Sequence, residues 1–160
     1  MLSSVSLMIA AMAIPQGDLK QLASWQALPT VRVCSNAPIS KYRVEEALDF
    51  WRGLGYEFGT IIYNDKTDWC YGSIYLGSIV IMPNQVLFDK HTLAQTNRVA
   101  YNELIVGAKI QIRADSYDKP LLLEHELGHA LGWPHYNVEG HIMHGALSKA
   151  GKETISLEKP

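Results

Sequence analysis

The stretch HELGHALGWPH, residues 125–135, places three histidines and one glutamate within eleven positions. In a helix, His125 and His129 lie on one face, about 5–6 Å apart at Cβ, so both imidazoles can reach one metal ion. Glu126 lies about 100° further round the helix, beside that ion rather than on it. This placement suits a general base acting on metal-bound water. The spacing therefore predicts a helix that carries a metal site.

The residues that follow predict how a third ligand reaches the same ion. Gly132 can adopt a positive φ, which ends the helix and turns the chain sharply. His135, three positions later, then returns to the metal and completes a three-histidine zinc site with one open coordination position. Glu139 is a rival third ligand, although carboxylates in this role normally come from a more distant helix. A stripe of leucines at four-residue spacing anchors the helix to a core: Leu123, Leu127 and Leu131.

The start of this helix is expected at Asp118-Lys119-Pro120. Proline is tolerated at the first helical position, and Asp118 can cap the free N–H groups there. The full spacing H-E-x-x-H-x-x-G-x-x-H arises by chance on the order of 10⁻⁵ times in a chain of this composition. These signals predict a helix from Asp118 to Leu131, followed by a turn at Gly132.

The rest of the chain alternates between strand and helix patterns. Ser40 is a plausible N-cap for a helix that ends at Gly53. One face of that helix is apolar: Val44, Ala47, Leu48 and Trp51. Four segments have strand character, namely residues 30–34, 57–63, 73–82 and 104–113. Residues 88–102 have no readable pattern. These elements predict one mixed domain of the α+β or α/β kind.

Composition and charge exclude several classes of protein. The 160 residues have a mass of 17.9 kDa, which is the size of one domain. A hydrophobic share of 48% excludes a disordered chain. A nucleic-acid-binding protein needs a positively charged surface. The formal net charge of −2 and the lack of a basic cluster in the sequence exclude this class.

Residues 125–135 match the zinc-binding consensus of the metzincin clan of metallopeptidases, and the chain resembles that clan beyond this motif. His141-Ile142-Met143-His144-Gly145 resembles its Met-turn. The resemblance implies a metzincin-type zincin fold of the α+β (α/β-like) class. Such a fold has a twisted, mostly parallel five-stranded sheet, a backing helix, an active-site helix and a short C-terminal subdomain. It also implies an antiparallel edge strand that binds the substrate backbone, expected within residues 99–106.

The resemblance also assigns roles to individual residues. It makes His125, His129 and His135 the ligands of one catalytic Zn²⁺, Glu126 the general base and Met143 the Met-turn methionine. The family within the clan is either matrixin-like or astacin-like. Gly145 stands where astacins have a tyrosine that serves as an extra ligand, so no fifth ligand is assigned. Five other residues are expected to pack or to support the site rather than to bind the metal: Tyr101, Tyr117, Tyr136, His141 and His144.

The N-terminus and the two cysteines bear on where the protein resides. Residues 1–14 are a signal peptide or an apolar N-terminal segment, and they are too short to span a membrane. Ala11-Met12-Ala13 fits a cleavage site, so a secreted protein is expected; the alternative is an intracellular protein, or part of a larger particle, that keeps its N-terminus. Cys34 and Cys70 either pair in an oxidising compartment or remain small core residues.

The function expected from these observations is that of a zinc-dependent metalloendopeptidase. Its catalytic domain spans residues 15–160, with an N-terminal subdomain of about 30–132 and a C-terminal subdomain of 133–160. The expected partner is a protein or peptide substrate bound in an extended form, with no nucleic acid and no stable membrane span. Two alternatives remain: a non-catalytic zinc-binding component of a larger assembly, and a zinc amidase that acts on cell-wall peptides.

Overall fold

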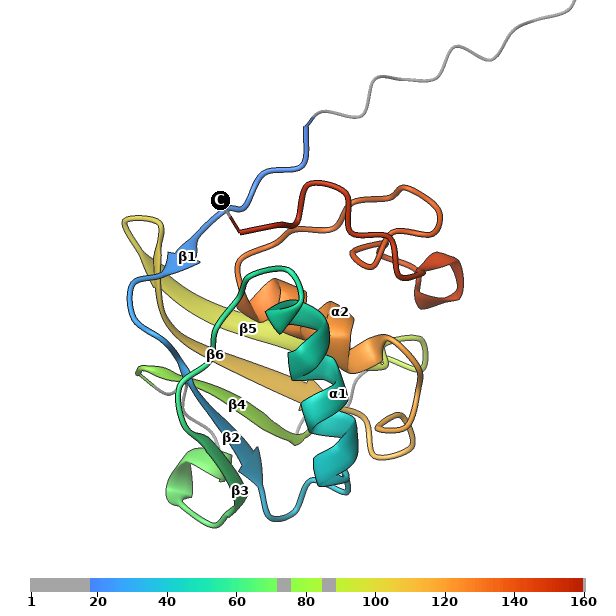
Figure 1. The fold of residues 1–160 in the computed structure, drawn as a ribbon. Coiled ribbons are helices and arrows are strands. Elements are labelled where there is room, and N and C mark those ends of the chain that lie inside the picture. Colours follow the sequence, from blue (N-terminus) through green and yellow to red (C-terminus); the bar gives the residue numbers. More distant parts are fainter. Residues whose placement is uncertain (1–17, 72–75, 85–88, 160) are drawn as a thin grey trace, which may run out of the picture.

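A computed structural model of the chain describes residues 18–71, 76–84 and 89–159 as two packed layers (Figure 1). One layer is a sheet and the other holds two helices, which lie side by side on one face of that sheet. The helices are α1 (Lys41–Arg52) and α2 (Leu122–Ala130). The strands are β1 (Ser24–Trp25), β2 (Thr30–Cys34), β3 (Ile61–Asp65), β4 (Ser78–Pro83), β5 (Ala94–Tyr101) and β6 (Leu104–Ile112). Two short 3₁₀ helices are η1 (Asp68–Tyr71) and η2 (Leu147–Lys149). The predicted segment 1–14 lies outside the described residues.

The sheet is mostly parallel, as expected, but six strands rather than five are found in the described residues. Strands β3, β2, β4 and β6 are neighbours in that order and run parallel, and β1 pairs parallel with the start of β6. Strand β5 is antiparallel, and in the described sheet it pairs with β6 alone. The expected edge at residues 99–106 is therefore correct for the end of β5 and wrong for β6, which is paired on both sides.

Several predicted elements have different bounds in the structure. The strand expected at residues 57–63 is β3, Ile61–Asp65, because Gly59 N–H donates to the carbonyl of Pro29 before any ladder forms. The strand expected at 73–82 is β4, Ser78–Pro83, and residues 73–75 lie outside the described part of the chain. Ser40 caps α1 as predicted, because its hydroxyl accepts a hydrogen bond from Arg43 N–H at 3.1 Å.

The predicted start of the second helix is wrong. Pro120 and Asp118 lie outside α2, which begins at Leu122 and has Leu121 as its N-cap. Residues 116–122 form successive turns, in which Lys119 N–H donates to Ser116 and Leu122 N–H donates to Lys119. Leu121 then takes a left-handed φ of 65°, and its carbonyl accepts the first helical hydrogen bond, from His125. The break at Leu121 separates the proline from the helix.

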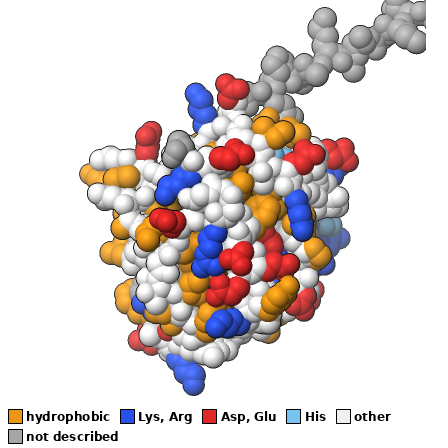
Figure 2. All heavy atoms as spheres, viewed as in Figure 1, with side chains coloured by type: hydrophobic (Ala, Val, Ile, Leu, Met, Phe, Trp, Pro, Cys, Tyr) orange, Lys and Arg blue, Asp and Glu red, His pale blue; other side chains and the backbone are white. Residues whose placement is uncertain are grey.

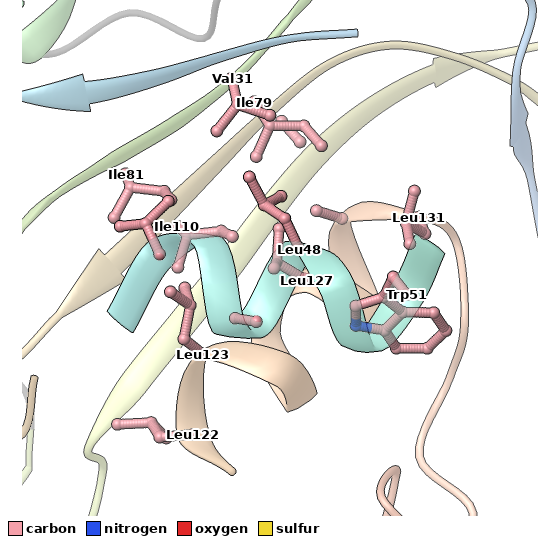
Figure 3. Packing of buried hydrophobic residues seen from close by; sticks show 14 of the residues in the cluster. Val31, Leu48, Trp51, Ile79, Ile81, Ile110, Leu122, Leu123, Leu127 and Leu131 are labelled. Atoms are coloured by element: carbon pink, nitrogen blue, oxygen red, sulfur yellow. The ribbon is translucent and has the colours of Figure 1, made fainter. Parts of the chain in front are cut away.

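Side chains from the sheet and from both helices meet in one core (Figure 3). The predicted apolar face of α1 is fully buried, with Trp51 at 0% exposure. Trp51 also joins the helices directly, because its indole N–H donates to the carbonyl of Glu124 at 2.8 Å. The labelled residues of the cluster include Val31, Ile79, Ile81 and Ile110 from the sheet and Leu48, Leu123 and Leu127 from the helices. The core thus fixes α2 against both α1 and the sheet.

A buried ion pair makes the second link between the helices. The Arg43 guanidinium donates to both carboxylate oxygens of Glu124, at 2.7 and 2.5 Å, and both side chains are largely buried. A two-pronged pair of this kind satisfies the donors and acceptors that burial takes from water. Glu124 directly precedes His125, so this pair holds α2 in place beside the histidines.

We expect Arg43→Met to lower the free energy of unfolding of the metal-free protein by about 3–5 kcal/mol, because it leaves a carboxylate buried and unpaired. Urea denaturation measures this loss. Asp49→Asn is the matched control, because Asp49 pairs with Arg52 in an exposed pair on the same helix, where the cost stays below about 1 kcal/mol. Equal effects of the two substitutions would contradict this role of the buried pair.

Cys34 and Cys70 form a disulfide that joins the end of β2 to η1 across a sequence separation of 36 residues. Both cysteines are buried and pack with Val80 and Met82. A disulfide of this kind indicates an oxidising environment. In the described residues, no helix is both long and apolar enough to cross a membrane.

Replacing both cysteines by alanine is expected to lower the free energy of unfolding by about 3–4 kcal/mol, since the unfolded chain regains the entropy of the closed loop. The midpoint of thermal unfolding measures the change. The reduced wild-type protein serves as control, because it loses the bond without losing side-chain volume. An unchanged midpoint on reduction would argue against a contribution of the bond to stability.

Candidate metal centre

Three histidines converge at one point, as the sequence predicts. His125 and His129 lie on α2, and His135 lies on the segment that follows. One ring nitrogen of each lies within 4.8 Å of the others, which suits one shared metal ion. The ring centroids form a nearly equilateral triangle, with separations of 4.6, 4.7 and 5.3 Å. In the described residues, Glu139 is not part of this cluster.

The turn at Gly132 brings His135 to the other two histidines. Gly132 N–H donates to the carbonyl of His129 at 3.0 Å, and Trp133 N–H donates to that of Gly128 at 2.9 Å. These two bonds form a Schellman motif, and Gly132 has the positive φ, 103°, that the motif requires. A Cβ at this position would also collide with the carbonyl oxygen of Ala23. Glycine is therefore needed for both the backbone conformation and the close approach.

The segment before β2 completes the end of α2, which the sequence did not indicate. The side-chain amide of Gln21 donates to the carbonyl of Leu131 at 2.6 Å, and the Trp25 indole donates to that of Ala130 at 3.0 Å. Leu22 N–H donates to the carbonyl of Gly132 at 2.9 Å. The last carbonyl groups of a helix lack partners within the helix, so these donors fix the turn in place.

Backbone contacts set the tautomer of the two helical histidines. Nδ1 of His125 lies 2.8 Å from the carbonyl oxygen of Ile142, and Nδ1 of His129 lies 2.7 Å from that of Trp133. A carbonyl oxygen only accepts, so each Nδ1 carries the proton. Each Nε2 then keeps its lone pair for a metal ion, which is the usual arrangement of metal-binding histidines. The donor set therefore fits zinc.

Burial keeps these histidines neutral. It lowers the pKa of His125 to about 4 and that of His129 to about 3. The pKa of His135 is also lowered by burial, and further by the nearby His144. A neutral imidazole is the form that binds a metal, so protons do not compete with the metal near pH 7.

Glu126 lies beside the cluster, buried at 5% exposure. Thr96, on β5, holds it: the Thr96 hydroxyl lies 2.5 Å from Oε2 of Glu126 and 3.1 Å from its backbone oxygen. Burial raises the pKa of Glu126 to about 7, although the hydrogen bond from Thr96 opposes this rise. A carboxyl group with a pKa near 7 can both accept and return a proton at neutral pH.

The contribution of β5 to this site was missed. Thr96 contacts Glu126, and the guanidinium of Arg98 donates to the carbonyl of His129 at 2.9 Å. Strand β5 lies inside the stretch 88–102, which is largely polar and has no apolar alternation. A sequence signal for either contact is absent, since both depend on the pairing of β5 with β6.

Met143 is fully buried and packs against α2 at Gly128. A Cβ on Gly128 would collide with the Met143 sulfur, and it would approach Cζ2 of Trp51 to 2.8 Å. The same turn carries Ile142, whose carbonyl accepts from His125, and the carbonyl of Met143 accepts from Tyr136 N–H at 2.8 Å. The turn thus holds the helix and the segment of the third histidine together.

A cavity of about 400 Å³ opens beside the histidine cluster. It is lined by His125, Glu126, His135 and His144, and by residues 89, 91–94 and 145–147 among others. The three tyrosines considered above do not line it. Tyr101 is exposed at the end of β5, Tyr117 is buried, and Tyr136 packs edge-on against His141 at 5.0 Å.

No model of a known protein family matches this chain, and no curated protein matches it. The mostly parallel sheet and the three-histidine cluster, close enough to bind one metal ion, are together compatible with a zincin. The face shown in Figure 2 carries acidic and basic side chains interspersed with apolar ones. The geometry of the three-histidine site is therefore the main evidence on function.

We expect Gly128→Ala to destabilise the protein by about 1–3 kcal/mol, because the added methyl group overpacks the contact with Met143. An alanine in an unconstrained helix position would instead stabilise by about 0.5–1 kcal/mol. Urea denaturation measures the difference. Combining Gly128→Ala with Met143→Ala should recover part of the loss in a double-mutant cycle. A Gly128→Ala protein as stable as the wild type would contradict this packing.

Proposed function

We propose that this protein is a zinc-dependent metalloendopeptidase of the metzincin clan. The observation that carries the proposal is the position of Glu126, a buried carboxyl group beside three converging histidines. A site that served structure alone would need the histidines but not an adjacent proton acceptor. The resemblance of residues 125–135 and of the turn at Met143 to that clan supports the same function.

In this proposal, Nε2 of His125 and of His129, together with a ring nitrogen of His135, hold one zinc ion. When bound, zinc supplies a Lewis acid that polarises a carbonyl oxygen and lowers the pKa of water. The protein supplies neutral ligands, since burial lowers the pKa of all three histidines. Neutral ligands leave the full charge of the ion available to the substrate.

Glu126 moves the proton in the proposed reaction. One carboxylate oxygen accepts a proton from the water that attacks the scissile carbonyl, and the carboxyl group then returns it to the leaving amine. The Thr96 hydroxyl keeps Oε2 in place during this exchange. The pKa of about 7 suits both halves of the transfer at neutral pH.

The substrate in this proposal is a protein or peptide in an extended conformation. In the described sheet, the edge of β5 that faces away from β6 offers backbone groups for such a chain. Thr96, on this strand, contacts Glu126, so the strand lies next to the proposed general base. The cavity next to His135 and His144 would take a substrate side chain. The antiparallel direction of β5 agrees with the edge strand that the resemblance implies.

The proposal also includes a domain organisation and a location for the protein. Residues 15–160 form the catalytic domain, with subdomains of about 30–132 and 133–160 that meet at the Gly132 turn. Residues 1–14 act as a signal peptide, and the protein is secreted. The disulfide between Cys34 and Cys70 supports this location, because such bonds persist in oxidising compartments.

The test of the proposal is Glu126→Gln, which keeps the shape of the side chain and removes its ability to accept a proton. We expect zinc content to be unchanged and the rate of casein cleavage to fall by about 10²–10⁴-fold. Glu139→Gln is the matched control, because Glu139 is an exposed acid outside the cluster and its removal should leave the rate unchanged.

Other results would contradict the role of Glu126 or indicate a different function. Cleavage of casein by zinc-loaded Glu126→Gln at the wild-type rate would contradict the role of Glu126. Release of peptides from peptidoglycan, without cleavage of casein, would indicate a cell-wall amidase. Stoichiometric zinc binding without either activity would indicate a structural zinc protein.

A further inference from the structure

His144 follows Met143 and lines the cavity beside His125, Glu126 and His135. Its side chain is largely buried, with the residue at 9% exposure. The sequence alone suggested a bystander or a supporting group. The hydrogen bond that its ring accepts from the backbone instead determines which ring nitrogen can donate to a bound ligand.

The tautomer of His144 is fixed by the backbone that follows it. Ala146 N–H lies 2.9 Å from Nδ1 of His144. A backbone N–H only donates, so Nδ1 must accept with its lone pair. The proton of the neutral ring is then on Nε2. This is the opposite tautomer from that of His125 and His129, whose Nδ1 atoms face carbonyl oxygens.

No acceptor for the Nε2 proton of His144 is found among the described residues. His141, three positions earlier, shows the contrast. Its Nδ1 accepts from Met143 N–H at 3.1 Å, and its Nε2 lies 3.2 Å from the carbonyl of Ile155. Both ring nitrogens of His141 are therefore used by the fold, whereas Nε2–H of His144 has no partner within the described part of the chain and can donate to a bound ligand.

The other donors around the cavity are already engaged or exposed. The Thr92 hydroxyl donates to Asp89 at 2.6 Å. Gly145 N–H donates to the side chain of Asn137 at 3.0 Å. His91 lines the cavity from an exposed loop. His144 is thus a largely buried residue of the cavity wall whose Nε2–H has no hydrogen-bond partner among the described residues.

The position of His144 is too remote for a fourth metal ligand in this cluster. The residues whose ligand atoms lie within 4.8 Å of one another are His125, His129 and His135, without His144. His144 is still close enough to lower the pKa of His125 and His135 after the effect of burial. His144 therefore lies outside the ligand group but on the wall of the cavity that His125 and His135 also line.

We infer that Nε2–H of His144 donates a hydrogen bond to an oxygen atom of the ligand held at the histidine cluster. In the proposed peptidase, on which this identification of the ligand rests, that atom is the scissile carbonyl oxygen, which becomes negatively charged as water attacks. A donor that faces the developing charge stabilises the transition state more than the bound substrate. His144 is then a second catalytic residue beside Glu126.

The first test needs no peptidase activity. A phosphonamidate dipeptide carries anionic oxygens on a tetrahedral phosphorus, and its Kd for the zinc-loaded protein is measured by calorimetry. We expect His144→Phe to raise this Kd by about 10–100-fold at unchanged zinc content, the range for loss of a hydrogen bond to a charged group. His144→Gln, which regains an N–H donor, should recover part of the affinity. Tyr42→Phe is the control, because Tyr42 is an exposed residue of α1 outside the cavity, and it should leave the Kd within about threefold.

Two results of this first test would overturn the inference. One is an unchanged Kd in zinc-loaded His144→Phe. The other is an equal loss of affinity in Tyr42→Phe, which would show an effect that is not specific to the cavity. Nitrogen-15 NMR of the histidine rings adds a direct check: the Nε2–H tautomer of His144 supports the inference, and the Nδ1–H tautomer contradicts it.

The second test uses turnover. If casein-derived peptides are cleaved, His144→Phe should lower kcat by about 10²–10³-fold and leave KM within about threefold. A rise in KM at constant kcat would contradict a transition-state role. The wild-type protein could bind the phosphonamidate through His144 and yet cleave no peptide. This result would refute the peptidase proposal and support His144 as the donor to the bound oxygen. Failure of the proposed function is therefore distinguishable from failure of the inference about His144.

Discussion

The reversal of the chain at Gly132 is the constraint on which the site depends. A continued helix would carry His135 along its axis and away from His125 and His129. The left-handed φ of 103° and the two Schellman hydrogen bonds turn the chain back instead. The close approach of Ala23 leaves no space for a side chain at this point. One residue without a Cβ thus sets the distance between the third histidine and the other two.

Contacts with the rest of the fold hold α2 in the position from which this turn brings His135 to the other two histidines. Trp51 and Arg43 tie α1 to the backbone and side chain of Glu124, and Met143 packs at Gly128. The same packing buries His125 and Glu126, which shifts the pKa of the histidine down and that of the glutamate up. Packing and electrostatics are therefore linked: the burial that orders His125 and His129 also keeps them neutral, and it raises the pKa of the Glu126 carboxyl group to about 7.

The sequence predicted those features that depend on short spacing. The facing of His125 and His129, the turn at Gly132 and the buried face of α1 follow from helical periodicity and from glycine. The features it missed depend on contacts between distant segments. Strand β5 is a polar edge strand, so Thr96 has no pattern that marks it. The late start of α2 is the exception, because it results from local backbone turns that end at Leu121. The partners of Gln21 and Trp25 lie more than 100 residues away, at the end of α2.

The most direct test of the central claim is a crystal structure of the zinc-loaded protein, with the metal located by anomalous scattering. We expect one ion with Nε2 of His125, Nε2 of His129 and a ring nitrogen of His135, each about 2.0–2.1 Å away, and one position open to solvent. Zinc bound elsewhere would contradict it. So would zinc at this cluster held through Nδ1 of either helical histidine, because that would require breaking the bonds to Ile142 and Trp133.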